Sequence, residues 1–229
     1  MKKGAYVQFP RTVVKNSGEN VCQGFAEIVS CLKEACNQNV KTILTVECYP
    51  GVNQQELLEG LQSLGAVLTI HSDDLAFEPE KIDALLEKDM MDSDPVFGIM
   101  TVRRLEDYFY NDKLEAARKE AEAVERGMVL IYGVGASLVH PGDVQVLADI
   151  TRWEIQLRLK KYKRGFFAEW RWADKVKEKL LPTMNFYLDM TTEGQPAMVD
   201  GDNYRQGLLK LSGQPFRMVP YFDPGVWGG

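Results

Sequence analysis

The stretch ILTVECYPGVNQQELLEGL, residues 43–61, decides the fold class. It begins with an apolar run, which predicts a buried strand at residues 42–46. Pro50 and Gly51 then predict a turn. Apolar residues at helical spacing predict a helix over residues 54–64. A strand, a turn and a helix in this order are typical of an α/β protein with a parallel sheet.

The same alternation of strands and helices continues along the chain. Apolar runs predict strands at residues 66–70, 128–132 and 144–150, and helical spacing predicts helices at residues 21–36, 80–88, 102–110, 113–126 and 151–164. The chain is therefore expected to form an α/β fold, a three-layer parallel sheet flanked by helices. We expect the α/β domain to span residues 39–212. An N-terminal extension and helix over residues 1–38 precede it, and a linker over residues 213–229 follows it.

The composition is that of an ordinary globular protein. The chain has 229 residues, 45% hydrophobic and 26% charged, and a net charge of -6. This bulk charge gives no reason to expect nucleic-acid binding. The apolar runs are too short for a membrane span, and the N-terminus does not read as a secretory signal, so a cytoplasmic protein is expected.

The four cysteines and two histidines give no pattern that is typical of a metal site. Cys22, Cys31, Cys36 and Cys48 form no CxxC pair. Disulfide frameworks are typical of small secreted domains, so this cytoplasmic chain is expected to hold four reduced, mostly buried thiols and no metal.

The turn after the first strand stands where a phosphate-binding loop would lie. Such a loop reads G-x-x-x-x-G-K-[ST], and its specifying positions fall here on Glu47, Val52, Asn53 and Gln54. None of the four matches, and the chemistry of the motif favours an ordinary strand–turn–helix corner. The backbone N–H groups at a helix N-terminus still attract anions, so the phosphate-binding candidates here are the residues from Pro50 to Gln54, namely Pro50, Gly51, Val52, Asn53 and Gln54.

Two acids follow the predicted strand at residues 66–70. Asp73 and Asp74 fall at the carboxyl end of that strand, the edge where α/β enzymes bind ligands. One of them could act as a general base or as a magnesium ligand. The alternative is a helix N-cap or a solvated turn, and both interpretations stay open.

A glycine-containing segment follows the predicted strand at residues 128–132. Residues 133–137 read GVGAS, which partly matches the dinucleotide-binding fingerprint. Leu138 occupies the place of the third glycine, and His140 with Pro141 turns the chain before a helix can form. The match favours a dinucleotide site only weakly.

Residues 158–179 form a basic and aromatic stretch. The stretch has nine Lys or Arg and three acids, a net charge of +6, and Phe166, Phe167, Trp170 and Trp172 are interleaved with them. It could be a mobile lid that clamps phosphates, a nucleic-acid surface on which bases stack, or a solvated amphipathic helix pair.

The order of these parts resembles the uridine kinase/phosphoribulokinase group of P-loop kinases. The resemblance is carried by residues 43–61, IHSDDLAF (70–77), GMVLIYGVGASL (127–138), DITRWEIQLRLKKYKRG (149–165) and LLPTMNFYLDM (180–190). It implies a P-loop nucleoside-triphosphatase-like fold. In that family a loop lysine and a Ser or Thr hold ATP phosphates and magnesium, an acid activates the substrate hydroxyl, and lid arginines stabilise the phosphoryl group.

Carried over residue by residue, the resemblance assigns the acid to Asp73 or Asp74 and the lid cations to Arg158 and Arg164. The loop lysine falls on Asn53, so its role has no occupant here. The resemblance therefore implies a kinase-like domain in which ATP and magnesium lack a main binding group.

The last ten residues carry a second resemblance. PYFDPGVWGG (220–229) is similar to the opening of the catalytic domain of class I phosphomannose isomerases. These are zinc enzymes that interconvert mannose 6-phosphate and fructose 6-phosphate. The resemblance implies a downstream isomerase domain of the same protein as a partner, with its zinc ligands beyond Gly229.

The sequence thus predicts a non-catalytic or regulatory kinase-like domain of a mannose-6-phosphate isomerase-related protein. It would bind a sugar phosphate or a nucleotide near residues 50–54, the two acids and the lid. One alternative is an active ATP-dependent nucleoside or sugar kinase in which Lys161 or Lys163 replaces the loop lysine. Another is a structural domain that forms a homo-oligomer through an apolar patch at residues 166–172.

Overall fold

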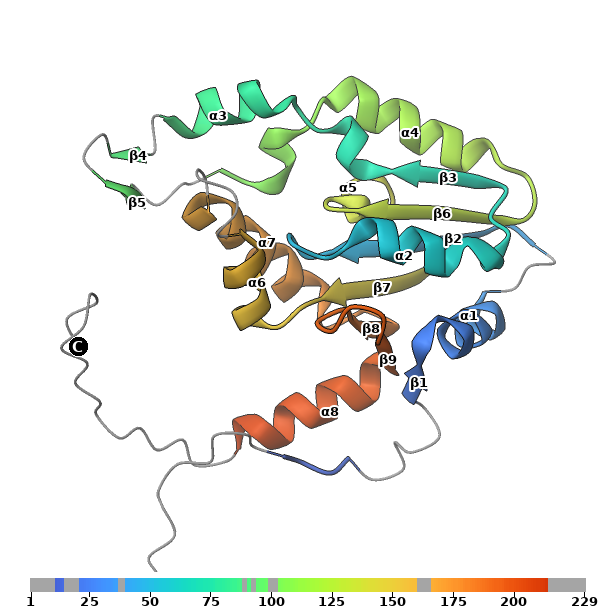
Figure 1. Cartoon of the computed structure of the whole chain (residues 1–229). Helices are drawn as coiled ribbons and strands as arrows, with labels where there is room; N and C mark the ends of the chain where they lie inside the picture. Colours follow the sequence, from blue (N-terminus) through green and yellow to red (C-terminus); the bar gives the residue numbers. More distant parts are fainter. Residues whose placement is uncertain are drawn as a thin grey trace, which may run out of the picture.

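Seven strands form one sheet in the order β1–β9–β8–β7–β2–β6–β3 (Figure 1). The computed structural model describes residues 11–14, 21–36, 40–87, 90–91, 94–98, 103–159 and 166–213. In chain order the strands of the sheet are β1 (Val21–Gln23), β2 (Thr42–Cys48), β3 (Leu68–His71), β6 (Met128–Gly133), β7 (Val144–Asp149), β8 (Phe186–Asp189) and β9 (Ala197–Asp200). A separate short pair consists of β4 (Met90–Met91) and β5 (Asp94–Gly98).

The sheet is mixed, which confirms an α/β fold but corrects the prediction of a parallel sheet. Strands β3, β6, β2, β7 and β8 pair in parallel. Strand β9 runs antiparallel to β8, and β1 runs antiparallel to β9. The reason is the connection at residues 190–196, which is too short for the crossover that a parallel pair requires.

The helices lie between the strands along the chain. They are α1 (Gly24–Ala35), α2 (Gln54–Leu61), α3 (Pro79–Glu87), α4 (Asn111–Ala123), α5 (Ala136–Val139), α6 (Arg152–Leu159), α7 (Phe166–Leu180) and α8 (Gly201–Ser212). Short 3₁₀ helices occur at η1 (Gln62–Leu64), η2 (Ser72–Leu75) and η3 (Leu105–Tyr108).

Several predicted elements differ from the structure. The predicted helix at residues 21–36 begins with β1, and α1 starts only at Gly24, whose positive φ of 73° ends the strand. Within residues 103–110 the predicted helix is reduced to η3. Strand β9 and helix α8 lie where no strand or helix was predicted. Part of the predicted helix at residues 151–164 lies outside the described residues, beyond the end of α6.

The direction in which the chain crosses the sheet reverses at β2. The connection from β2 through α2 passes β6 to reach β3, whereas the connection from β6 through α5 passes β2 to reach β7. Because such crossovers are right-handed, α2 and α5 lie on opposite faces. Helix α1 packs with α2, and α4 packs with α5. The crevice at the carboxyl end of β2 is therefore the topological switch point, where open α/β sheets bind ligands.

The core lies along the central strands. Every residue of β2, β6 and β7 is buried, as expected for strands covered on both faces. Helix α1 adds Ile28, Val29 and Leu32 to the same core. Among the described residues, no helix combines the length and the apolar character needed to cross a membrane.

The prediction of four reduced thiols was wrong for one pair of cysteines. Cys22 in β1 and Cys31 in α1 form a disulfide, since α1 begins directly after β1 and contacts it. Cys36 and Cys48 are free and buried. Burial raises the pKa of Cys36 to about 11.

Candidate functional site

The loop after β2 is a tight turn. The N–H of Tyr49 donates to the carbonyl of Ala148 at 2.8 Å, and the N–H of Val52 donates back to the carbonyl of Tyr49 at 3.1 Å. The side chain of Asn53 caps α2 by accepting the N–H of Glu56 at 3.2 Å. The predicted strand–turn–helix corner is thus present, and Asn53 already uses its side chain at the helix N-terminus.

Glu47 turns inward at the end of β2. Its side chain is buried, and its carboxylate accepts the N–H groups of Gly135 and Ser137, each at 2.7 Å. Burial raises the pKa of Glu47 to about 7, although the two N–H bonds act to lower it. A carboxyl group therefore occupies the sheet edge where a phosphate-binding loop would place a glycine.

Asp73 and Asp74 meet two further polar side chains at the end of β3. Asp73 accepts the N–H of Val134 at 2.7 Å and the amide of Gln54 at 2.9 Å. The amide oxygen of Gln54 lies 2.7 Å from Nε2 of His71, and Nδ1 of the same ring lies 3.3 Å from the carboxylate of Asp74. The structure thus brings three predicted residues, Gln54, Asp73 and Asp74, into one cluster.

The two acids have different roles in this cluster. The side chain of Asp73 is 39% exposed and holds the loop after β6 through Val134, whereas that of Asp74 is 76% exposed. The carboxylate of Asp74 is therefore accessible from solvent, whereas that of Asp73 is engaged by Val134 and Gln54.

His71 belongs to this cluster and was missed by the sequence reasoning. Its ring stacks on Tyr132 with centroids 4.8 Å apart. The available signal was its place at the same strand end, two residues before Asp73.

The glycine-containing segment after β6 binds carboxylates of its own chain. The N–H groups of Val134, Gly135 and Ser137 are taken by Asp73 and Glu47. These contacts argue against the dinucleotide interpretation, because those N–H groups already have anionic partners.

Glycine is required in this segment by a close approach. Gly133 has a φ of 118°, and a Cβ there would lie 2.5 Å from Oγ of Ser72. The glycine that suggested a dinucleotide site therefore allows the β3 end to pack against the β6 end.

Arg158, predicted to bind phosphate, contacts three parts of the protein. Its guanidinium donates to the carbonyl of Gly51 at 3.0 Å and to the carbonyl of Thr191 at 2.8 Å. It also pairs with Glu154 at 3.2 Å. These contacts engage the donors that a phosphate would need. Arg164, Lys161 and Lys163 lie outside the described residues.

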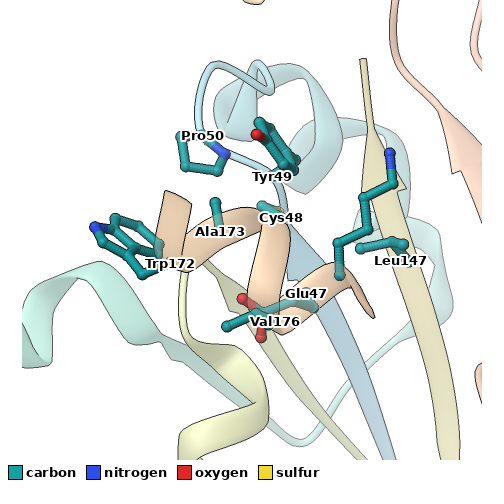
Figure 2. A pocket seen from close by; sticks show the side chains of 9 residues that line it. Glu47, Cys48, Tyr49, Pro50, Leu147, Trp172, Ala173 and Val176 are labelled. Carbon is teal, nitrogen blue, oxygen red and sulfur yellow. The ribbon is translucent and has the colours of Figure 1, made fainter. Parts of the chain in front are cut away.

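Helix α7 lies against the crevice at the ends of β2 and β7 (Figure 2). A pocket of about 10 Å³ remains there, which is room for about one water molecule. It is lined by Glu47, Cys48, Tyr49, Pro50, Leu147, Trp172, Ala173, Val176 and Lys177. This pocket is too small for a nucleotide. Among the described residues, no group of three or more His, Cys, Asp or Glu side chains is placed to hold a metal ion.

The fold and the site define an α/β domain with a mixed seven-stranded sheet and a cluster of polar side chains at the carboxyl edge of its parallel strands. A family model described as "Domain of unknown function (DUF8485)" matches residues 24–161 and 158–213, so the chain belongs to this family. No curated protein matches the chain.

Proposed function

We propose that this chain is a non-catalytic, kinase-like ligand-binding domain with a regulatory role in a mannose-6-phosphate isomerase-related protein. Two features support a P-loop nucleoside-triphosphatase-like fold for it. The strand–turn–helix corner stands at the topological switch point after β2. The ordered segments that resemble the uridine kinase/phosphoribulokinase group include this corner.

One observation carries the non-catalytic part of the proposal, and it is the inward carboxyl group of Glu47. This group is bound to the N–H groups of Gly135 and Ser137, at the edge where a kinase would hold phosphates. When ionised, it repels a phosphate at about 4–6 Å by roughly 3–4 kcal/mol at an effective dielectric constant near 20. Asn53 supplies no compensating charge. Lys177 lines the same pocket but pairs with Asp149.

The polar cluster at β3 suits the hydroxyl groups of a sugar. Asp74, His71 and Gln54 together offer hydrogen-bond acceptors and donors at the protein surface. The ammonium group of Lys113 lies 3.4 Å from the backbone carbonyl oxygen of Asp74 and offers a positive charge beside the acids. A phosphorylated sugar matches this combination of carboxylate and ammonium groups.

The link to an isomerase rests on the resemblance of residues 220–229, which lie outside the described residues. A domain that binds a sugar phosphate without converting it is suited to report the level of that metabolite to a neighbouring domain. A regulatory role follows from this combination.

Titration calorimetry with mannose 6-phosphate and fructose 6-phosphate tests the ligand assignment. The wild type is expected to bind at least one of them with a saturable isotherm. Asp74→Ala is expected to weaken this binding tenfold or more, because charge-assisted hydrogen bonds to the sugar are lost. Its thermal melting should stay close to that of the wild type, since the side chain is 76% exposed.

The matched control is Asp83→Ala, which removes an exposed carboxylate from α3 and should bind like the wild type. Absence of binding by the wild type, or equal binding by Asp74→Ala, would show that the ligand assignment is wrong.

A further inference from the structure

The crevice at the switch point is closed by the second half of α7. Trp172, Ala173 and Val176 of this helix lie against the strand end and the turn at Tyr49 and Pro50 (Figure 2). The cluster at β3 remains exposed on the other side of β6. The pocket at the end of β2 therefore leaves no room for a ligand while α7 stays in this position.

Polar contacts hold α7 in place from the side of the turn. Asp174 accepts the hydroxyl of Tyr49 at 2.9 Å and pairs with Arg152 of α6 at 3.2 Å. The side chain of Asp174 is 36% exposed, so water can compete for these contacts. One carboxylate thus joins α7 to both the turn and α6.

A second polar contact joins α7 to the end of β7. Lys177 pairs with the buried carboxylate of Asp149, which also accepts the hydroxyl of Tyr187 at 2.9 Å. Because the carboxylate of Asp149 is buried, it would lose its charged partner if α7 moved away, so this contact favours the closed position.

Within the described part of the chain, a buried donor of α7 lacks an acceptor. The indole N–H of Trp172 has no hydrogen-bond partner among the described residues, although its side chain is buried. A buried donor without an acceptor opposes the closed arrangement, because its desolvation is not compensated by a hydrogen bond. In the closed position the indole N–H of Trp172 therefore lacks a hydrogen bond to any residue that the structure describes, whereas water would reach this group if the helix moved away.

We propose that α7 is a displaceable cover that keeps the switch-point crevice closed, and that breaking the contacts of Asp174 opens it. In the closed position α7 leaves room for about one water molecule at the edge where α/β proteins bind ligands. This inference deepens the proposed function and rests on it for the identity of the ligand site. The position of the cover can be tested without any ligand.

Cys48 provides the readout, because it is one of the residues that line the pocket beneath α7. It is free and 1% exposed, and burial raises its pKa well above the ordinary value. In the wild type its modification by N-ethylmaleimide, followed by peptide mass spectrometry, should be slow. Asp174→Ala is expected to accelerate it tenfold or more, since the contacts to Tyr49 and Arg152 are both lost.

Cys36 is the internal control, since it is equally buried and is not one of the pocket-lining residues. The rate at which N-ethylmaleimide modifies Cys36 should be the same in the wild type and in Asp174→Ala. Glu178→Ala, at an exposed position of the same helix, should leave both rates unchanged. Tyr49→Phe removes a single hydrogen bond and should accelerate the modification of Cys48 by a smaller factor than Asp174→Ala does.

Two outcomes would overturn the proposal. In the first, Cys48 reacts equally slowly in the wild type, Asp174→Ala and Tyr49→Phe. In the second, the modification of Cys36 accelerates in parallel with that of Cys48, which would indicate global unfolding. Neither outcome depends on sugar-phosphate binding, so failure of the cover and failure of the ligand assignment can be distinguished.

Discussion

Raising the pH from 4.5 to 7 is expected to lower the free energy of unfolding of the wild type by roughly 3 kcal/mol relative to Glu47→Gln. The cause is the buried carboxyl group of Glu47, whose pKa rises from 4.5 to about 7 on folding. In this pH window the folded protein keeps a proton that the unfolded chain has already lost. Folding is therefore opposed more strongly as the pH increases.

Outside this window the contribution is constant. Below pH 4.5 the group is protonated in both states and brings no penalty, whereas above pH 7 it is ionised in both states and the full penalty is present. The glutamine variant is neutral at every pH, so the site makes no pH-dependent contribution in that variant.

Urea denaturation of both proteins at a series of pH values measures this difference. Glu125→Gln is the control, because it removes an exposed glutamate and should give a curve parallel to that of the wild type. Parallel curves for the wild type and Glu47→Gln would contradict the buried, proton-binding position of Glu47.

Arg158→Ala is expected to lower the free energy of unfolding by roughly 3 kcal/mol. The substitution leaves the partly buried carbonyl groups of Gly51 and Thr191 without their guanidinium donor, and each loss costs about 1–3 kcal/mol. Arg158→Lys should recover only part of the loss, because one ammonium group cannot reproduce the planar fork of donors.

Denaturant unfolding checks this value, with Arg126→Ala as a charge-matched control at an exposed position. A phosphate-binding role for Arg158 predicts the opposite pattern. Arg158→Ala would then unfold within 0.5 kcal/mol of the wild type, a change of the size usual for surface substitutions, and lose only ligand affinity.

The central part of the fold could be predicted from the sequence because it depends on local patterns. Strands β2, β6 and β7 are continuous apolar runs, and the Pro50–Gly51 turn is followed by helical spacing. The position of Asp73 and Asp74 also followed from the sequence, since residues directly after parallel strands meet at one edge of the sheet.

The remaining features depend on contacts between distant residues. Nothing near Glu47 shows that its carboxylate reaches Gly135, 88 residues away, or that Arg158 reaches Gly51 across 107 residues. Strand β1 takes its place by pairing with β9, at the far end of the chain. Its three residues are too few to give a periodic signal of their own.

Calorimetric titration with magnesium-ATP, at protein concentrations that reveal millimolar binding, tests the proposed non-catalytic role most directly. The carboxyl group of Glu47, the neutral Asn53 and the engaged guanidinium of Arg158 predict no saturable heat. A saturable isotherm, accompanied by ATP consumption with a sugar or a nucleoside, would contradict this account and would favour an active kinase in which another cation replaces the missing loop lysine.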